Sequence, residues 1–151
     1  MFGSFLATML TSFFATLGFG VLLHAPGRAL LPASATGMAA HGCYWLLEAF
    51  GVSGQAAIFA AAAGAAILAE LLARRMKMAA TVFVTLSIIP LVPGLSLYRA
   101  MAFLAQGQGE AGVELGVSAM LTILMISLGI GMGSFLVRLG RGSAPTTPPK
   151  G

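Results

Sequence analysis

The chain has 151 residues, of which 58% are hydrophobic and only 8% are charged. This composition, with a mean hydropathy of +0.97, excludes an ordinary soluble domain. Eight basic and four acidic residues would suggest nucleic-acid binding if the basic groups clustered on a soluble face, but they lie in short stretches between apolar runs. We therefore expect a membrane protein whose surroundings are the lipid bilayer and which does not bind nucleic acid.

Apolar runs long enough to cross a membrane follow one another along the chain. They cover residues 1–27, 29–47, 49–69, 78–98 and 115–137. Each has roughly the 20 residues that a helix needs to cross a hydrocarbon core about 30 Å thick. The first run has no Lys or Arg ahead of its apolar stretch, so we expect a retained span rather than a secretory signal. The sequence predicts an all-α polytopic membrane protein with about five transmembrane helices.

The second run is the least regular of the five. It begins with Pro32, Ser34 and Thr36, and it carries His41. Such a segment is also compatible with an interfacial or re-entrant position, because its polar and helix-breaking residues weaken the case for a full span. A protein with four spans is therefore the alternative.

The basic residues predict the orientation. With five spans, seven of them fall on one side: Arg28, Arg74, Arg75, Lys77, Arg138, Arg141 and Lys150. Arg99 falls on the other side, with Glu110 and Glu114. Because basic loops remain in the cytoplasm, this distribution predicts a cytoplasmic C-terminus and an external N-terminus. Without the second span, six basic residues oppose two, which keeps the C-terminus in the cytoplasm but moves the N-terminus.

The composition changes near the end of the chain. Residues 1–139 form the predicted transmembrane domain, and residues 140–151 are rich in Gly, Ser, Thr and Pro. We predict that this second segment is a disordered cytoplasmic tail, because it has too few apolar residues to build a core. No internal repeat makes the chain a complete inverted-repeat transporter, so half of a larger transporter is a plausible interpretation.

The fourth run contains Pro90, Pro93 and Gly94 near its middle. Two prolines remove backbone donors there, so we expect a broken helix. Broken helices at membrane depth occur where protein or a water-filled cavity surrounds the freed backbone groups, as at transporter binding sites. Pro93 would lie in the first turn of a second half-helix, whose positive end suits a carboxylate substrate. The alternative is a simple kink without a ligand.

Ser96 and Arg99 follow this break. Arg99 lies about five residues beyond it, on the order of 8 Å further along a helix. One interpretation is an intramembrane cation that holds a substrate carboxylate. The other is a side chain that extends to the outer interface, with Tyr98 as an aromatic anchor.

His41 and Glu48 are seven residues apart and share one helix face. Both can change charge, so they are the candidates for proton coupling. Alternatively, Glu48 marks the end of the span, beside Trp45 in an interfacial belt. Glu70 and Arg74 have i,i+4 spacing and are most simply a surface pair without a transport role.

Other chemistry is absent from the sequence. Cys43 is the single cysteine, there is no Asp, and no metal-ligand spacing, glycine-rich phosphate loop or G-x-S-x-G motif occurs. We expect no enzyme activity, no cofactor and no metal site. Two ridges of small residues instead permit close helix contacts. They are Ala56, Ala60 and Gly64 in one run, and Gly129 and Gly133 in another.

Three segments carry a resemblance to a known family. They are Gly18 to Gly20 followed by Pro26 to Arg28, Gly37 through His41 and Gly42, and Ile89 to Tyr98 with its Pro-x-x-Pro-Gly motif. The chain resembles the threonine/serine exporter (ThrE) family over residues 14–136, and specifically its short second-half subunit of the YjjB type. Its positions that match the family motifs are Pro26, Arg28, His41, Gly42, Pro90, Pro93 and Gly94. It departs at Cys43 and Tyr44, where some relatives have a basic residue.

The resemblance implies a secondary exporter in the bacterial inner membrane. Its substrates would be small carboxylate-bearing metabolites, either amino acids such as threonine and serine or dicarboxylates such as succinate. A separately encoded first-half subunit of the YjjP type would complete it, and assembly into a higher oligomer is also possible. We expect transport to be driven by the proton gradient. The alternatives are a non-transporting subunit that supports a partner membrane protein, and a passive pore.

Overall fold

The computed structural model describes the backbone of residues 2–140 and the side chains of residues 5–140. Its helices are α1 (Phe2–Leu22), α2 (Gly27–Ala49), α3 (Gly54–Met76), α4 (Ala80–Ile88), α5 (Gly94–Ala105) and α6 (Gly109–Leu139), with a 3-10 turn, η1 (Ile89–Leu91), after α4. The part of the chain that the structure describes contains no strand. The predicted all-α membrane fold is confirmed.

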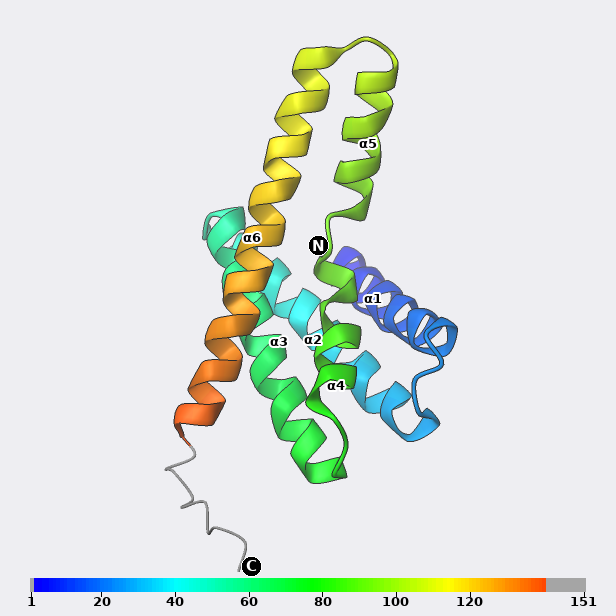
Figure 1. Ribbon diagram of the computed structural model, residues 1–151, viewed down its shortest axis with the longest axis vertical. Helices are drawn as coiled ribbons and strands as arrows, with labels where there is room; N and C mark the ends of the chain where they lie inside the picture. The colour runs from blue at the N-terminus through cyan, green and yellow to red at the C-terminus, as the bar shows by residue number, and fades with distance from the viewer. Residues whose placement is uncertain (1, 141–151) are drawn as a thin grey trace, which may run out of the picture.

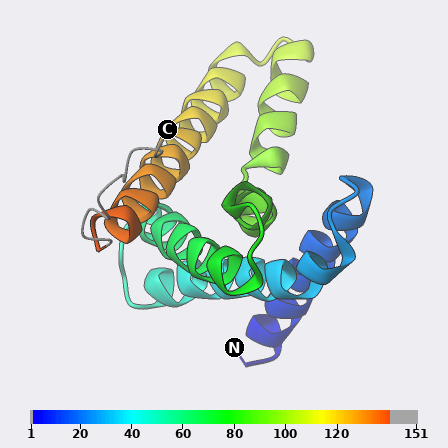
Figure 2. The same ribbon diagram turned by 60° about the horizontal axis from the view of Figure 1, so that its bottom comes forward.

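Helix α6 is the longest element, and α3 and α5 lie along it (Figure 1). Its 31 residues correspond to about 46 Å. The second half of α6 packs on α3, whereas α5 runs beside its first half and forms a hairpin that extends beyond the other helices. In Figure 2, α4 is seen nearly end-on, and it packs on both α2 and α3. Helix α1 lies mainly against α2.

Three helices of the described chain are long and apolar enough to cross a membrane, namely α1, α3 and α6. The α4–η1 segment and α5 qualify together, at a bend of 53°. Counting this pair as one broken span gives four, which agrees with the four-span alternative rather than with five. Helix α2 is continuous through Pro32 and 23 residues long, but it is not among the candidates.

Close backbone contact joins α3 and α6. A Cβ added at Gly129 would lie 2.6 Å from the carbonyl oxygen of Phe59 and 2.8 Å from the Cβ of Ala62. Gly133 makes an equally close approach to Ala63. The glycines of the predicted α6 ridge thus serve helix packing. Gly64 of the other ridge has nothing within 4 Å, so that ridge is not the surface that receives α6.

The core is built mainly from alanines, which let the helices approach each other closely. One cluster joins α2, α3 and α4: Ala29, Ala33, Ala69, Ala73, Phe83 and Leu86. Phe83 and Leu86 are the largest of its side chains and are almost completely buried. Packing on α4 therefore holds the segment before the helix break in place.

Arg74, in the last turn of α3, lies close to the end of α6. Arg74 donates to Glu70 Oε2 at 3.3 Å and to the carbonyl oxygen of Val137, near the end of α6, at 3.4 Å. The prediction of a surface pair is wrong for Glu70, which is only 8% exposed. Burial follows because the packing of α6 on α3 covers this turn.

The predicted tail, residues 140–151, lies outside the described residues except for Gly140. Gly140 ends α6, and its amide donates to the carbonyl oxygen of Leu136 at 3.1 Å.

Candidate functional site

The break in the fourth run has a defined geometry. Helix α4 ends at Ile88, η1 contains Pro90, and Val92 is extended at φ −66° and ψ 128°. Pro93 then caps α5, which begins at Gly94. The broken helix is confirmed, with Pro93 immediately before the second helix rather than in its first turn. No side chain caps the N-terminus of α5, so its backbone dipole is not offset locally.

A cavity of about 240 Å³ lies at this break. Its wall combines five elements of the fold: α2, α3, η1, α5 and α6. The lining residues are His41, Tyr44, Ile58, Pro90, Leu91, Pro93, Ser96 and Thr122. The structure therefore brings four predicted site residues together, although His41 is about 50 positions away from the break in the sequence. We call this cavity the break pocket.

Polar and apolar groups are mixed in the break pocket. His41 Nδ1 is buried and has no hydrogen-bond partner among the described residues. The Thr122 hydroxyl donates to the carbonyl oxygen of Ser118 at 3.0 Å, so its lone pairs remain as acceptors. Ile58 and Leu91 supply the apolar part of the wall. An apolar cavity with a few convergent polar groups is typical of a small-molecule site.

Tyr44 extends the polar wall toward Glu48. Its ring centroid lies 5.9 Å from that of His41, and its hydroxyl donates to Glu48 Oε1 at 2.7 Å. Glu48 is exposed near the end of α2 and does not line the break pocket. The two candidates for proton coupling are thus connected through a tyrosine that the sequence analysis did not assign to the site.

Other predicted site residues lie elsewhere. Arg99 is exposed on α5 and does not line the break pocket, and Gly94 is exposed at the start of the same helix. Pro26 and Arg28 lie at the start of α2, where both are exposed. Gly42 is buried, and a Cβ on it would meet Met9 Sδ at 3.0 Å, so it serves the packing of α1 on α2.

Ile58 and Thr122 also line the break pocket but were missed by sequence reasoning. Both lie in long apolar helices, and neither residue type stands out in such a helix. Only the packing of α3 and α6 brings them next to the break. For Tyr44 a signal existed, because it shares the face of α2 that carries His41 and Glu48.

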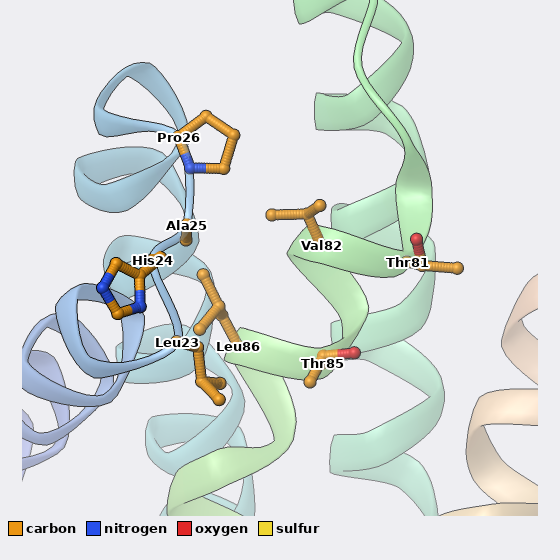
Figure 3. A pocket seen from close by; sticks show the side chains of 8 residues that line it. All are labelled: Leu23, His24, Ala25, Pro26, Thr81, Val82, Thr85 and Leu86. Atoms are coloured by element: carbon orange, nitrogen blue, oxygen red, sulfur yellow. The ribbon is translucent and has the colours of Figure 1, made fainter.

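A second cavity, of about 300 Å³, lies between the α1–α2 connection and α4 (Figure 3). His24 lies on one side of it, and Thr81 and Thr85 lie on the other, with Val82 and Leu86 between them. Because its polar side chains do not converge, we assign no binding role to this cavity.

Comparison with known proteins agrees with this architecture. Residues 8–136 match the threonine/serine exporter (ThrE) family. The chain belongs to this family. It is also 34% identical over 100 residues to a probable threonine/serine exporter of Mycobacterium tuberculosis, in an alignment that covers 64% of this chain and 19% of that protein. The chain thus spans about a fifth of the length of this relative. No solved structure matches it.

Members of a transporter family need a path and a site for their cargo within the membrane. The family is one of transporters, and in such proteins helices broken at membrane depth occur at binding sites.

Proposed function

We propose that this chain is a subunit of a secondary exporter for small carboxylate-bearing metabolites, and that the break pocket binds the substrate. The observation that carries the proposal is the meeting of His41, with an unpartnered buried Nδ1, and the uncapped start of α5 in one cavity. A protonated imidazole and a helix N-terminus both favour a negative group. The substrate carboxylate binds between them.

The break pocket favours a substrate with one carboxylate. His41 is the one lining residue that can carry a positive charge, because Tyr44, Ser96 and Thr122 contribute only neutral hydroxyls. A second carboxylate would stay without a cationic partner in a partly desolvated site. The cavity, at about 240 Å³, is also smaller than typical drug-sized sites. Threonine and serine, which appear in the names of the family and of its relative, fit these limits better than a dicarboxylate such as succinate.

Proton-driven export follows from the same group. Protonation of His41 strengthens carboxylate binding, and loss of the proton releases the substrate. In the bacterial inner membrane, the positive-inside distribution of Arg74, Lys77 and Arg138 orients the C-terminus toward the cytoplasm. A first-half subunit of the YjjP type completes the transporter, in keeping with the much greater length of the relative.

In this proposal Arg99 does not hold the substrate within the break pocket, although its sequence position made it a candidate for that role. It lies on α5, three residues after Ser96, but its side chain is exposed. We propose that it meets the substrate carboxylate on the way to or from the break pocket, or pairs with the partner subunit.

Flux in liposomes tests the proposal. This chain and its first-half partner are reconstituted together, and export of labelled L-threonine is measured under an imposed pH gradient. We expect His41→Gln and Ser96→Ala to lower the initial rate by roughly tenfold or more, as expected for losing polar contacts to a buried substrate. Ser127→Ala is the matched control, because Ser127 is exposed on α6 and bonds only to its own helix.

Three results would contradict the proposal in different ways. Flux no higher than in protein-free liposomes would favour the non-transporting support subunit. Flux that ignores the pH gradient would favour a passive pore. Unchanged flux in both pocket variants, at normal expression, would place the substrate site outside the break pocket, and Arg99→Ala would then test the exposed face of α5.

A further inference from the structure

Tyr44 belongs to two features at once. Its ring lines the break pocket beside His41, and its hydroxyl is bound to Glu48 outside the pocket. A phenol has one proton to donate, and here the Glu48 carboxylate accepts it at 2.7 Å. The buried Nδ1 of His41 has no partner among the described residues. The hydroxyl is thus committed to Glu48 while a buried polar atom of the pocket is left unpaired.

The strength of the Tyr44–Glu48 bond depends on the charge of the carboxyl group. A hydrogen bond to an ionised carboxylate is roughly twice as strong as one between neutral groups. Protonation of Glu48 therefore weakens its hold on Tyr44 and adds a competing O–H donor. The phenol hydroxyl is then free to turn toward acceptors in the break pocket.

We propose that Tyr44 couples the ionisation of Glu48 to the occupancy of the break pocket. While Glu48 is ionised, it holds the Tyr44 hydroxyl at the end of α2. Once Glu48 is protonated, the hydroxyl donates within the pocket to a bound carboxylate. Tyr44 is thus a positioning residue that gives Glu48 an effect on a site it does not line, and this inference rests on the proposed function for the identity of the substrate.

The helices around Glu48 carry few titratable groups near it that could produce the same pH dependence. Helix α1, α4 and η1 contain none, and on α3 the first is Glu70, more than four turns beyond the start of that helix. Gly54, at the start of α3, faces Glu48 Oε1, since a Cβ on it would lie 3.8 Å away. The other titratable groups of α2 and of the helices around the pocket are Arg28, His41, Cys43, Arg74, Arg75, Tyr98, Arg99, Glu110, Glu114 and Arg138. Among the described residues, Glu48 accepts a hydrogen bond from Tyr44.

The position of Glu48 suits the direction of proton flow. It lies beside Gly54 at the start of α3, whereas the opposite end of that helix carries Arg74 and Arg75, which the charge distribution assigns to the cytoplasm. Glu48 is then exposed to the external pH. Protons that drive export enter from this side of the membrane. External acid would release the Tyr44 hydroxyl from Glu48 while the break pocket is open to the outside of the cell.

Trp45 provides a readout that needs no substrate. It is the single tryptophan of the chain, adjacent to Tyr44 and three residues before Glu48. The full chain is placed in lipid vesicles, and Trp45 emission is recorded from about pH 4 to about pH 8, which covers carboxyl and imidazole titration. We expect an emission change that Glu48→Gln and Tyr44→Phe both remove and that His41→Gln retains. A wild-type titration curve in either of the first two variants would overturn the proposal.

Threonine binding gives the second readout. In the reconstituted assembly with the first-half partner, we expect the Kd for L-threonine to change by about fivefold or more across that range, the lower limit of ordinary coupling between sites. Tyr44→Phe and Glu48→Gln should reduce this change to the part that His41 alone produces, and the double variant should match either single variant because both remove the same link. A pH profile in both variants that equals that of the wild type would refute the role of Tyr44 and leave the substrate site standing.

The two proposals fail separately. If the wild-type assembly does not bind threonine but the Trp45 titration behaves as expected, the proposed substrate is wrong and the Tyr44–Glu48 coupling is retained. If threonine binds and Trp45 emission is the same in wild type and both variants, the coupling is wrong and the proposed function is retained.

Discussion

Gly129 of α6 lies directly against the backbone of α3 at Phe59, and a Cβ at Gly129 would lie only 2.6 Å from the Phe59 carbonyl oxygen. The obstacle is backbone, which cannot turn away as the end of a flexible side chain can. Helix α6 packs on α3, forms a hairpin with α5 and contributes one wall of the break pocket. This contact therefore contributes to the placement of Thr122 in the pocket.

We expect Gly129→Ala to destabilise the protein by on the order of 1–3 kcal/mol, because the added methyl group must force the two helices apart. Gly131→Ala is the matched control on the same helix, since Gly131 has nothing within 4 Å. The measurement is the unfolding midpoint in mild detergent. Equal midpoints for the two variants would show that α3 and α6 pack less closely than they do in the structure.

Gly37 makes the corresponding contact between α2 and α1. A Cβ there would lie 2.5 Å from the Thr16 hydroxyl oxygen, and Thr16 is completely buried. We expect Gly37→Ala to lower stability by about 1–3 kcal/mol. Thr16→Ala should partly rescue it, because it removes the hydroxyl that the new methyl meets. The unfolding midpoints of the two single variants and the double variant check this, and strictly additive losses would contradict it.

The Arg74–Glu70 pair contributes to stability at the basic end. Removing Arg74 leaves the carboxylate of Glu70, which is 8% exposed, without its cation and also frees the carbonyl of Val137. We expect Arg74→Ala to cost on the order of 1–3 kcal/mol. Arg75→Ala is the control, because Arg75 is exposed and surface changes seldom exceed about 0.5 kcal/mol. Thermal unfolding of both variants decides whether the pair is more than a surface contact.

The proposed orientation can be tested by chemical labelling. In a Cys43→Ala background, we introduce Lys77→Cys in the α3–α4 connection or Gln108→Cys in the α5–α6 connection. In intact cells, an impermeant maleimide should label the second position and spare the first, because the basic connection remains in the cytoplasm. The reverse pattern would invert the proposed topology and place Glu48 on the cytoplasmic side.

The sequence was sufficient for features that depend on local chemistry. Pro90 and Pro93 remove backbone donors whatever surrounds them, so the break could be predicted from the chain alone. The apolar composition likewise required helices in lipid, because a membrane offers no other partner for backbone groups. The number of spans was less secure. The polar character of α2 left four or five open, and four is what length and hydropathy support.

Tertiary structure decided which of the predicted site residues meet. His41 reaches Pro93 and Ser96 because α2 packs against η1, whereas Arg99, only three residues beyond Ser96, is exposed on α5. Spacing along a helix fixes which residues share a face, but the neighbour of that face depends on contacts between distant segments. For the same reason Glu70 was mistaken for a surface group, and Tyr44 gained a role in the pocket wall. Local sequence determined the break and the apolar helices, and the packing of five separate elements determined the site.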